Sequence, residues 1–180
     1  RMAYKLLRIN KEKTFNLSRS LEEVMTKVVT CEICGIYLDY EDAELQKNSK
    51  EHLCIGKNRD TTTICVTESP ADIYIIEDST NYDGDYFALK GNLSPLDGLG
   101  PEEIGINKLK YRLEHESFKE LILATSTTIE GEATAHFIQN ICENLDIKVS
   151  RIAFGIPLNG ELSYLDGETI SHAFSERKEL

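Results

Sequence analysis

The sequence lacks a long hydrophobic run, an excess of basic side chains and an even number of cysteines. No apolar stretch approaches the roughly 20 residues needed to cross a bilayer, which excludes a membrane span, and no signal-peptide pattern is present. Twenty Lys and Arg against 31 Asp and Glu give a net charge of −11, which excludes a uniformly basic DNA-coating protein. Five cysteines argue against a fully paired disulfide framework, so we expect a cytoplasmic protein with reduced thiols or a metal site.

The composition that remains is that of a folded domain. Hydrophobic residues make up 41% of the chain and charged residues 28%, which is typical of soluble globular proteins. A length of 180 residues is enough to bury a core in one domain of ordinary size or in two small ones.

Basic side chains are concentrated at the start of the chain. Residues 1–30 hold seven basic and three acidic residues, a net charge of +4, so the remaining 150 residues carry −15. Phosphate contacts supply most non-specific affinity for nucleic acids, so we expect DNA contacts in this segment. The candidate contact residues are Arg1, Lys5, Arg8 and Lys11. The alternative is a solvated helix with ordinary surface lysines.

Helical patterns occupy much of this first segment. Residues 1–7 read as the middle of a helix with no N-cap, so we expect a leading segment before them. Residues 20–29 have apolar positions at helical spacing, which predicts a helix with Ser20 as N-cap and Glu23 as its capping-box partner. Three aromatic residues lie at helical spacings, which favours a place in the core over stacking on nucleic-acid bases: Tyr4, Tyr111 and Phe118.

Strand and helix patterns alternate from residue 62 onward. Compact β-branched and apolar runs predict strands at 62–67, 86–89, 120–125 and 148–153. Amphipathic patterns between them predict helices at 71–77, 107–116 and 129–144. This alternation is typical of an α/β fold with a mostly parallel sheet flanked by helices. Ligand groups in such sheets lie at the carboxyl ends of strands, where Glu68 and residues 126–130 fall.

A cysteine pair precedes the first of these strands. Cys31 and Cys34 are spaced as half of a zinc motif, in which one tight turn presents two thiolates to a tetrahedral ion. The second half has Cys54, with Glu51 at the expected partner position and His52 next to it. We therefore predict a Zn²⁺ site in a zinc-finger-like module. The alternatives are that Glu51 replaces His52 as a ligand, or that the metal has been lost and packing holds the loop.

The two other cysteines have a different environment. Cys65 lies in a predicted strand and Cys142 in a predicted helix. We expect both to be buried as small hydrophobic side chains rather than to bind metal.

Four ordered motifs together resemble the RecR family of bacterial recombination mediators. The motifs are ICVTESPADIY (64–74), GNLSPLDGLGP (91–101), LAT followed by EGEATA (123–125 and 130–135), and SRIAFGIP followed by GEL (150–157 and 160–162). The resemblance covers nearly the whole chain. It implies the end of a helix-hairpin-helix region with a linking helix at 1–30, a four-cysteine zinc finger at 31–54, a Toprim domain at 62–157 and a C-terminal arm at 158–180.

The resemblance also implies a function. Proteins of this family act without known turnover in recombinational repair, where they work with RecO and RecF to help load RecA on single-stranded DNA gaps. We therefore expect partners of three kinds: single- and double-stranded DNA, RecO and RecF, and further copies of the chain in a homodimer or a tetrameric ring. The expected location is the cytoplasm, in association with the nucleoid.

Three features of the sequence depart from the family pattern. Most of the helix-hairpin-helix is absent, because Arg1 matches its end. The third zinc cysteine is replaced by Glu51, and Glu176-Arg177 stands where the family usually has Gly-Arg. These departures bear on DNA affinity and metal occupancy.

The acidic positions of Toprim enzymes are only partly present. Such enzymes hold a divalent metal with a strand-end glutamate and an Asp-x-Asp pair; here Glu68 matches the glutamate, but residues 126–128 read Ser-Thr-Thr. Hydroxyls are poor substitutes for carboxylates as Mg²⁺ ligands, so we expect neither bound Mg²⁺ nor strand cleavage. The alternative function is a residual metal-dependent nuclease or primase-like enzyme.

Glu68 and Glu130 form the expected Toprim acidic site, as a polar group for partner docking. For Glu130 and Glu132, charge complementarity with the start of a helix is the alternative explanation.

Overall fold

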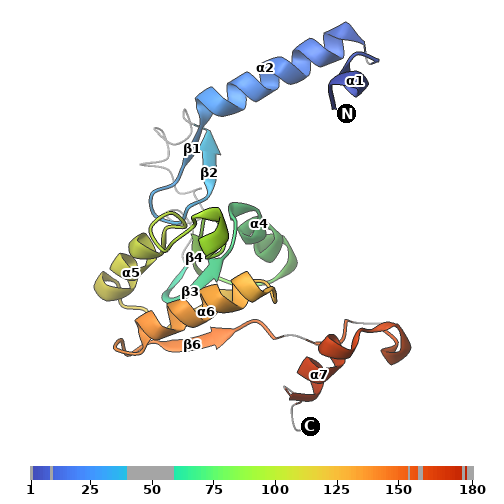
Figure 1. Ribbon diagram of the computed structural model, residues 1–180. Helices are drawn as coiled ribbons and strands as arrows, with labels where there is room; N and C mark the ends of the chain where they lie inside the picture. The colour runs from blue at the N-terminus through green and yellow to red at the C-terminus, as the bar shows by residue number, and fades with distance from the viewer. Residues whose placement is uncertain are drawn as a thin grey trace.

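The computed structural model describes residues 2–8, 10–39, 59–153, 155–157, 160–175 and 177. Arg1, His52 and Cys54 lie outside the described residues. Figure 1 shows an N-terminal helical arm, a β-hairpin, an α/β body and a C-terminal segment. Among the described residues, no helix has the length and apolar character to cross a membrane.

The N-terminal arm consists of α1 (Met2–Leu6) and α2 (Lys11–Lys27). In Figure 1, α2 extends away from the body, and none of its side chains is buried. The predicted N-cap at Ser20 is wrong, because the N-cap of α2 is Asn10, ten residues earlier. The side chain of Asn10 accepts a hydrogen bond from the Glu12 N–H at 2.9 Å and so caps the first turn.

The hairpin pairs β1 (Val28–Thr30) with β2 (Tyr37–Asp39) in antiparallel fashion. Its tight turn packs on the edge of the body, where the Ala88 N–H donates to the Cys34 carbonyl at 2.7 Å. Gly35 in this turn has φ +80°, and a Cβ there would lie 2.6 Å from the Ala88 carbonyl oxygen. Glycine therefore permits both the turn and the close approach.

The body is a four-stranded parallel sheet in the order β4-β3-β5-β6, which confirms the predicted α/β fold. The described helices and strands of the body follow the predicted segments to within two residues at each end: β3 (Asp60–Thr67), α4 (Pro70–Ser79), β4 (Gly84–Ala88), α5 (Ile106–His115), β5 (Glu120–Ala124), α6 (Ile129–Cys142) and β6 (Lys148–Arg151).

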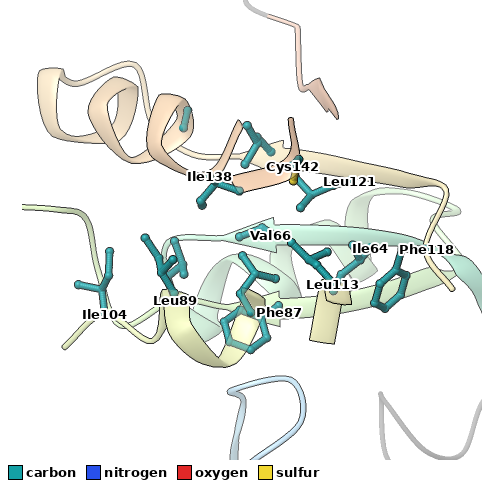
Figure 2. Close-up of a cluster of buried hydrophobic side chains, with 14 residues drawn as sticks. Ile64, Val66, Phe87, Leu89, Ile104, Leu113, Phe118, Leu121, Ile138 and Cys142 are labelled. Atoms are coloured by element: carbon teal, nitrogen blue, oxygen red, sulfur yellow. The ribbon is translucent and has the colours of Figure 1, made fainter. Parts of the chain in front are cut away.

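Alternation along β3 divides the core into two layers, because successive side chains of a strand point to opposite faces. Ile64 and Val66 pack with residues of α5 and α6 (Figure 2), whereas Cys65 packs with α4 and the hairpin. Cys65 and Cys142 are both 3% exposed, which confirms that they are core residues. Burial raises the pKa of the Cys65 thiol to about 12.

Two further segments lie outside the sheet. The loop after β4 contains a short 3₁₀ turn, η1 (Pro95–Asp97), which is closed by the Ser94–Leu99 bridge. After β6 come η2 (Leu162–Tyr164) and α7 (Gly167–Ser175), neither of which has a buried residue. Figure 1 shows α7 lying apart from the sheet.

Candidate functional site

The carboxyl ends of β3, β5 and β6 meet the first turn of α6 at one edge of the sheet. Strand register brings them level, since Thr67 pairs with Ala124 and Leu123 pairs with Arg151. Glu68 directly follows β3, and its carboxylate accepts a hydrogen bond from the backbone N–H of Ser126, just beyond β5. We call this cluster of Glu68, Ser126, Thr128, Glu132 and Arg151 the acidic edge.

Gly131 permits α6 to approach the acidic edge. A Cβ at this position would lie 3.0 Å from Glu68 Oε1 and closer still to the carbonyl oxygen of Ser126. No larger residue fits without moving one of these groups. The glycine therefore fixes how near the first turn of the helix comes to the Glu68 carboxylate.

Ser126 and Thr128, whose hydroxyls stand in place of the Asp-x-Asp pair, form hydrogen bonds at the start of α6. Thr128 is the N-cap of α6, and its Oγ1 accepts a hydrogen bond from the Gly131 N–H at 3.1 Å. Ser126 Oγ lies 2.8 Å from the same Thr128 oxygen. The pair thus closes the start of α6.

Arg151 supplies the positive charge of the acidic edge. Its Nη1 donates to Glu132 Oε2 at 2.7 Å and its Nη2 donates to the Ser126 carbonyl at 2.8 Å. The hydrogen bond from Arg151 is the largest cause that lowers the pKa of Glu132. Glu130 is exposed, and within the described ranges its side chain has no hydrogen bond or ion pair. The acid that joins the network is therefore Glu132, and sequence reasoning missed the role of Arg151.

Comparisons with known proteins match nearly the whole chain. Residues 62–153 match the model of the Toprim domain, and residues 155–178 match that of the RecR C-terminal region. The chain is 46% identical over 178 residues to "Recombination protein RecR" of Hahella chejuensis. The matched region covers 99% of this chain and 85% of that protein. The chain is 47% identical over 178 residues to the protein of the same name from Coxiella burnetii, with 98% and 85% covered.

The chain belongs to the RecR family. This confirms the resemblance inferred from the four motifs. The acidic edge lies in the Toprim domain of this RecR chain, at the carboxyl ends of its parallel strands.

The donor set of the acidic edge does not fit the magnesium site of Toprim enzymes. Mg²⁺ is bound through carboxylates and phosphates in octahedral geometry. Here one Glu68 oxygen is bonded to a backbone amide, and Glu132 is paired with Arg151. Throughout the part of the chain that the structure describes, no group of three or more His, Cys, Asp or Glu side chains is arranged to hold a metal ion.

The cysteine pair of this RecR chain lies in the hairpin turn. The Cys31 N–H donates to the Ile36 carbonyl at 2.8 Å, and the Gly35 N–H donates to the Cys31 carbonyl at 3.0 Å. Cys34 is 1% exposed and Cys31 is partly buried. The other two proposed ligands, His52 and Cys54, are outside the described residues, so the zinc site stays a prediction.

Arg112 of α5 joins the hairpin to the sheet. Its Nη1 donates to the carbonyls of Ile33, at 3.2 Å, and Tyr86, at 3.1 Å. The same guanidinium pairs with Glu116 at 2.7 Å and with Asp85 at 3.4 Å. Burial raises the pKa of Asp85, and the positive charge of Arg112 opposes that rise.

The predicted DNA-contact residues lie on the N-terminal arm. Lys5, Arg8 and Lys11 are all exposed: Lys5 belongs to α1, Arg8 lies in the turn after α1, and Lys11 begins α2. Figure 1 shows α1 at the end of the arm that is farther from the sheet.

Proposed function

We propose that this chain is a non-enzymatic, DNA-binding mediator of recombinational DNA repair, acting with RecF and RecO to help load RecA on single-stranded gaps. The membership of the RecR family supports this role, since the relatives are named recombination proteins. The proposed absence of catalysis is based on the side chains of the acidic edge. Its only strand-end glutamate is bonded to a backbone amide, and hydroxyls stand in place of the Asp-x-Asp pair. We place the protein in the cytoplasm, on the nucleoid.

A turnover assay separates this function from a residual nuclease. The full chain is incubated with labelled single- and double-stranded DNA and with Mg²⁺ or Mn²⁺. We expect no cleavage above the level of the Glu68→Ala variant. Metal-dependent cleavage that Glu68→Ala abolishes would overturn the proposal.

DNA binding is assigned to the arm because charge is divided between the parts of the chain. Residues 1–30 carry +4, whereas residues 59–157 hold eight basic and 17 acidic residues. The body therefore repels phosphates, and the arm attracts them.

Charge reversal tests this assignment. Lys5→Glu, Arg8→Glu and Lys11→Glu together should remove most affinity for DNA and reduce the slope of log affinity against log salt. A matched control reverses three exposed lysines of the body, Lys90, Lys110 and Lys119, and should change affinity far less. Fluorescence anisotropy at several salt concentrations measures both. Equal losses in the two triple variants would contradict the assignment.

We further propose that Zn²⁺ binds Cys31, Cys34, His52 and Cys54. The tight turn that carries the two described cysteines supports the proposal. Elemental analysis should find about one zinc per chain in the purified protein. The Cys31→Ser variant should lose it. A folded protein without zinc would show that packing alone holds the hairpin.

We also propose that the chain forms a homodimer or a tetrameric ring. The apolar side chains of α2 support this, because one face of the helix carries an exposed stripe of Leu17, Leu21 and Val24, which Val28 continues at the start of β1. Large apolar surface of this kind marks interaction sites.

A further inference from the structure

Arg151 bridges two separate parts of the acidic edge. One guanidinium nitrogen bonds to the side chain of Glu132 on α6, and another bonds to the main chain of Ser126 after β5. The side chain is 21% exposed, so most of it is removed from solvent. Because the backbone N–H of the same Ser126 donates to Glu68, one residue links the arginine to the strand-end glutamate.

The charge of this bridge is permanent. Arginine stays protonated in proteins, and its planar fork holds two acceptors in fixed directions. A bound divalent cation would perform the same two tasks, neutralising carboxylates and holding the loop after β5 beside the first turn of α6. The guanidinium and a divalent cation cannot both occupy this position, since the positive charge of Arg151 would repel a cation bound beside it.

We propose that the guanidinium of Arg151 takes the place of the divalent cation of a metal-dependent Toprim site and keeps such cations off the acidic edge. Arg151 is thus a positioning residue, which acts through Glu132 and Ser126. The proposal concerns only the electrostatics of this edge, and it holds whether or not the chain acts with the partners named above.

Titration of the full chain with Mn²⁺ alone tests the proposal. The Arg151→Ala variant frees the carboxylate of Glu132 and removes a positive charge, so it should bind Mn²⁺ at least about tenfold more tightly than the unchanged chain. Arg151→Lys keeps a cation and should behave like the unchanged chain. Adding Glu132→Gln to Arg151→Ala should abolish the gain. Isothermal titration calorimetry and the electron paramagnetic resonance signal of Mn²⁺ report the binding.

Two results would overturn the proposal. One is an Arg151→Ala variant that is folded by circular dichroism and binds Mn²⁺ no more tightly than the unchanged chain. The other is an unchanged chain that binds Mn²⁺ at the acidic edge, shown by loss of that binding in Glu68→Gln. The second measurement decides the matter if Arg151→Ala fails to fold, and absence of such binding then supports the proposal. DNA affinity, measured separately on the arm variants, reports on the proposed function and not on Arg151.

Discussion

Single residues at the acidic edge determine its geometry. Gly131 lets α6 approach the Ser126 loop, and Thr128 closes the first turn of the helix. Arg151 then fixes the loop from the other side. A change at any of the three alters the position of the Ser126 N–H and therefore the Glu68 carboxylate that it binds.

Gly131→Ala should destabilise the protein. The new methyl group would overlap the Ser126 carbonyl, and overpacking of this kind costs about 1–3 kcal/mol, only partly offset by about 1 kcal/mol of better helix propensity. Urea unfolding followed by circular dichroism measures the loss. Gly167→Ala is the control, because a Cβ there has no atom within 4 Å. Equal stability of the two variants would show that the close approach of α6 does not matter.

Residue-level predictions from the sequence succeeded where local pattern decides the outcome. The position of Glu68 at the carboxyl end of a strand was predicted correctly, because it directly follows a β-branched run. Arg151 was missed because its role depends on β6 lying next to β5 and on the angle of α6, which no local pattern reports. Tyr4 and Tyr111 were wrongly predicted to be core residues and are 75% and 63% exposed, whereas Phe118 is 5% exposed as predicted. Helical spacing identifies a face but does not show that another element covers it.

At the scale of elements, a single side chain joins the hairpin to the sheet. Arg112 contacts a carbonyl of the hairpin turn and one of β4, with two carboxylates around it. The Ala88–Cys34 hydrogen bond adds a direct link between the two backbones. The hairpin is therefore held by buried polar contacts as well as by the packing of Ile36 and Cys34 against the core.

Arg112→Met should be strongly destabilising. It removes both carbonyl contacts and deprives the buried Asp85 of its ion pair with Arg112. Removing one partner of a buried ion pair costs about 3–5 kcal/mol. The control is Lys110→Met on the same helix, an exposed residue whose pair with Glu114 spans 3.8 Å, where we expect a change below about 0.5 kcal/mol. Urea midpoints give both values. A small effect of Arg112→Met would mean that packing alone holds the hairpin.

Element boundaries show which signals the sequence carries. The body was predicted to within two residues at each end because buried strands and amphipathic helices have strong periodicity. The start of α2 was missed because its first turns are polar and Asn10 is the only marker of the cap. Strand order and the docking of the hairpin depend on contacts between distant residues, and neither was predicted.

At the scale of the whole molecule, the arm and the C-terminal segment expose apolar side chains. Beyond the stripe on α2, the C-terminal segment presents Leu162, Tyr164 and Phe174, which are 58%, 85% and 68% exposed. Both segments extend from the body in Figure 1. Such surfaces are costly in water, and they are where the proposed contacts between copies of the chain would form.

Leu21→Glu should weaken self-association. A carboxylate in the middle of the α2 stripe would be desolvated in any interface that covers it. Sedimentation velocity over a range of concentrations should show a shift toward smaller species. Thr26→Glu adds the same charge on the opposite face of the helix and should leave the distribution unchanged. If both variants associate like the unchanged chain, the stripe is not an interface.

The edge of the sheet formed by β6 affects how the protein behaves at high concentration. In the described part of the chain, β6 is an edge strand of only four residues, with Lys148 at its start and Arg151 at its end. Short strands with charged ends are poor templates for adding a further strand. Ordered growth of the sheet into fibrils is therefore disfavoured, although the arm and the C-terminal segment still expose apolar side chains.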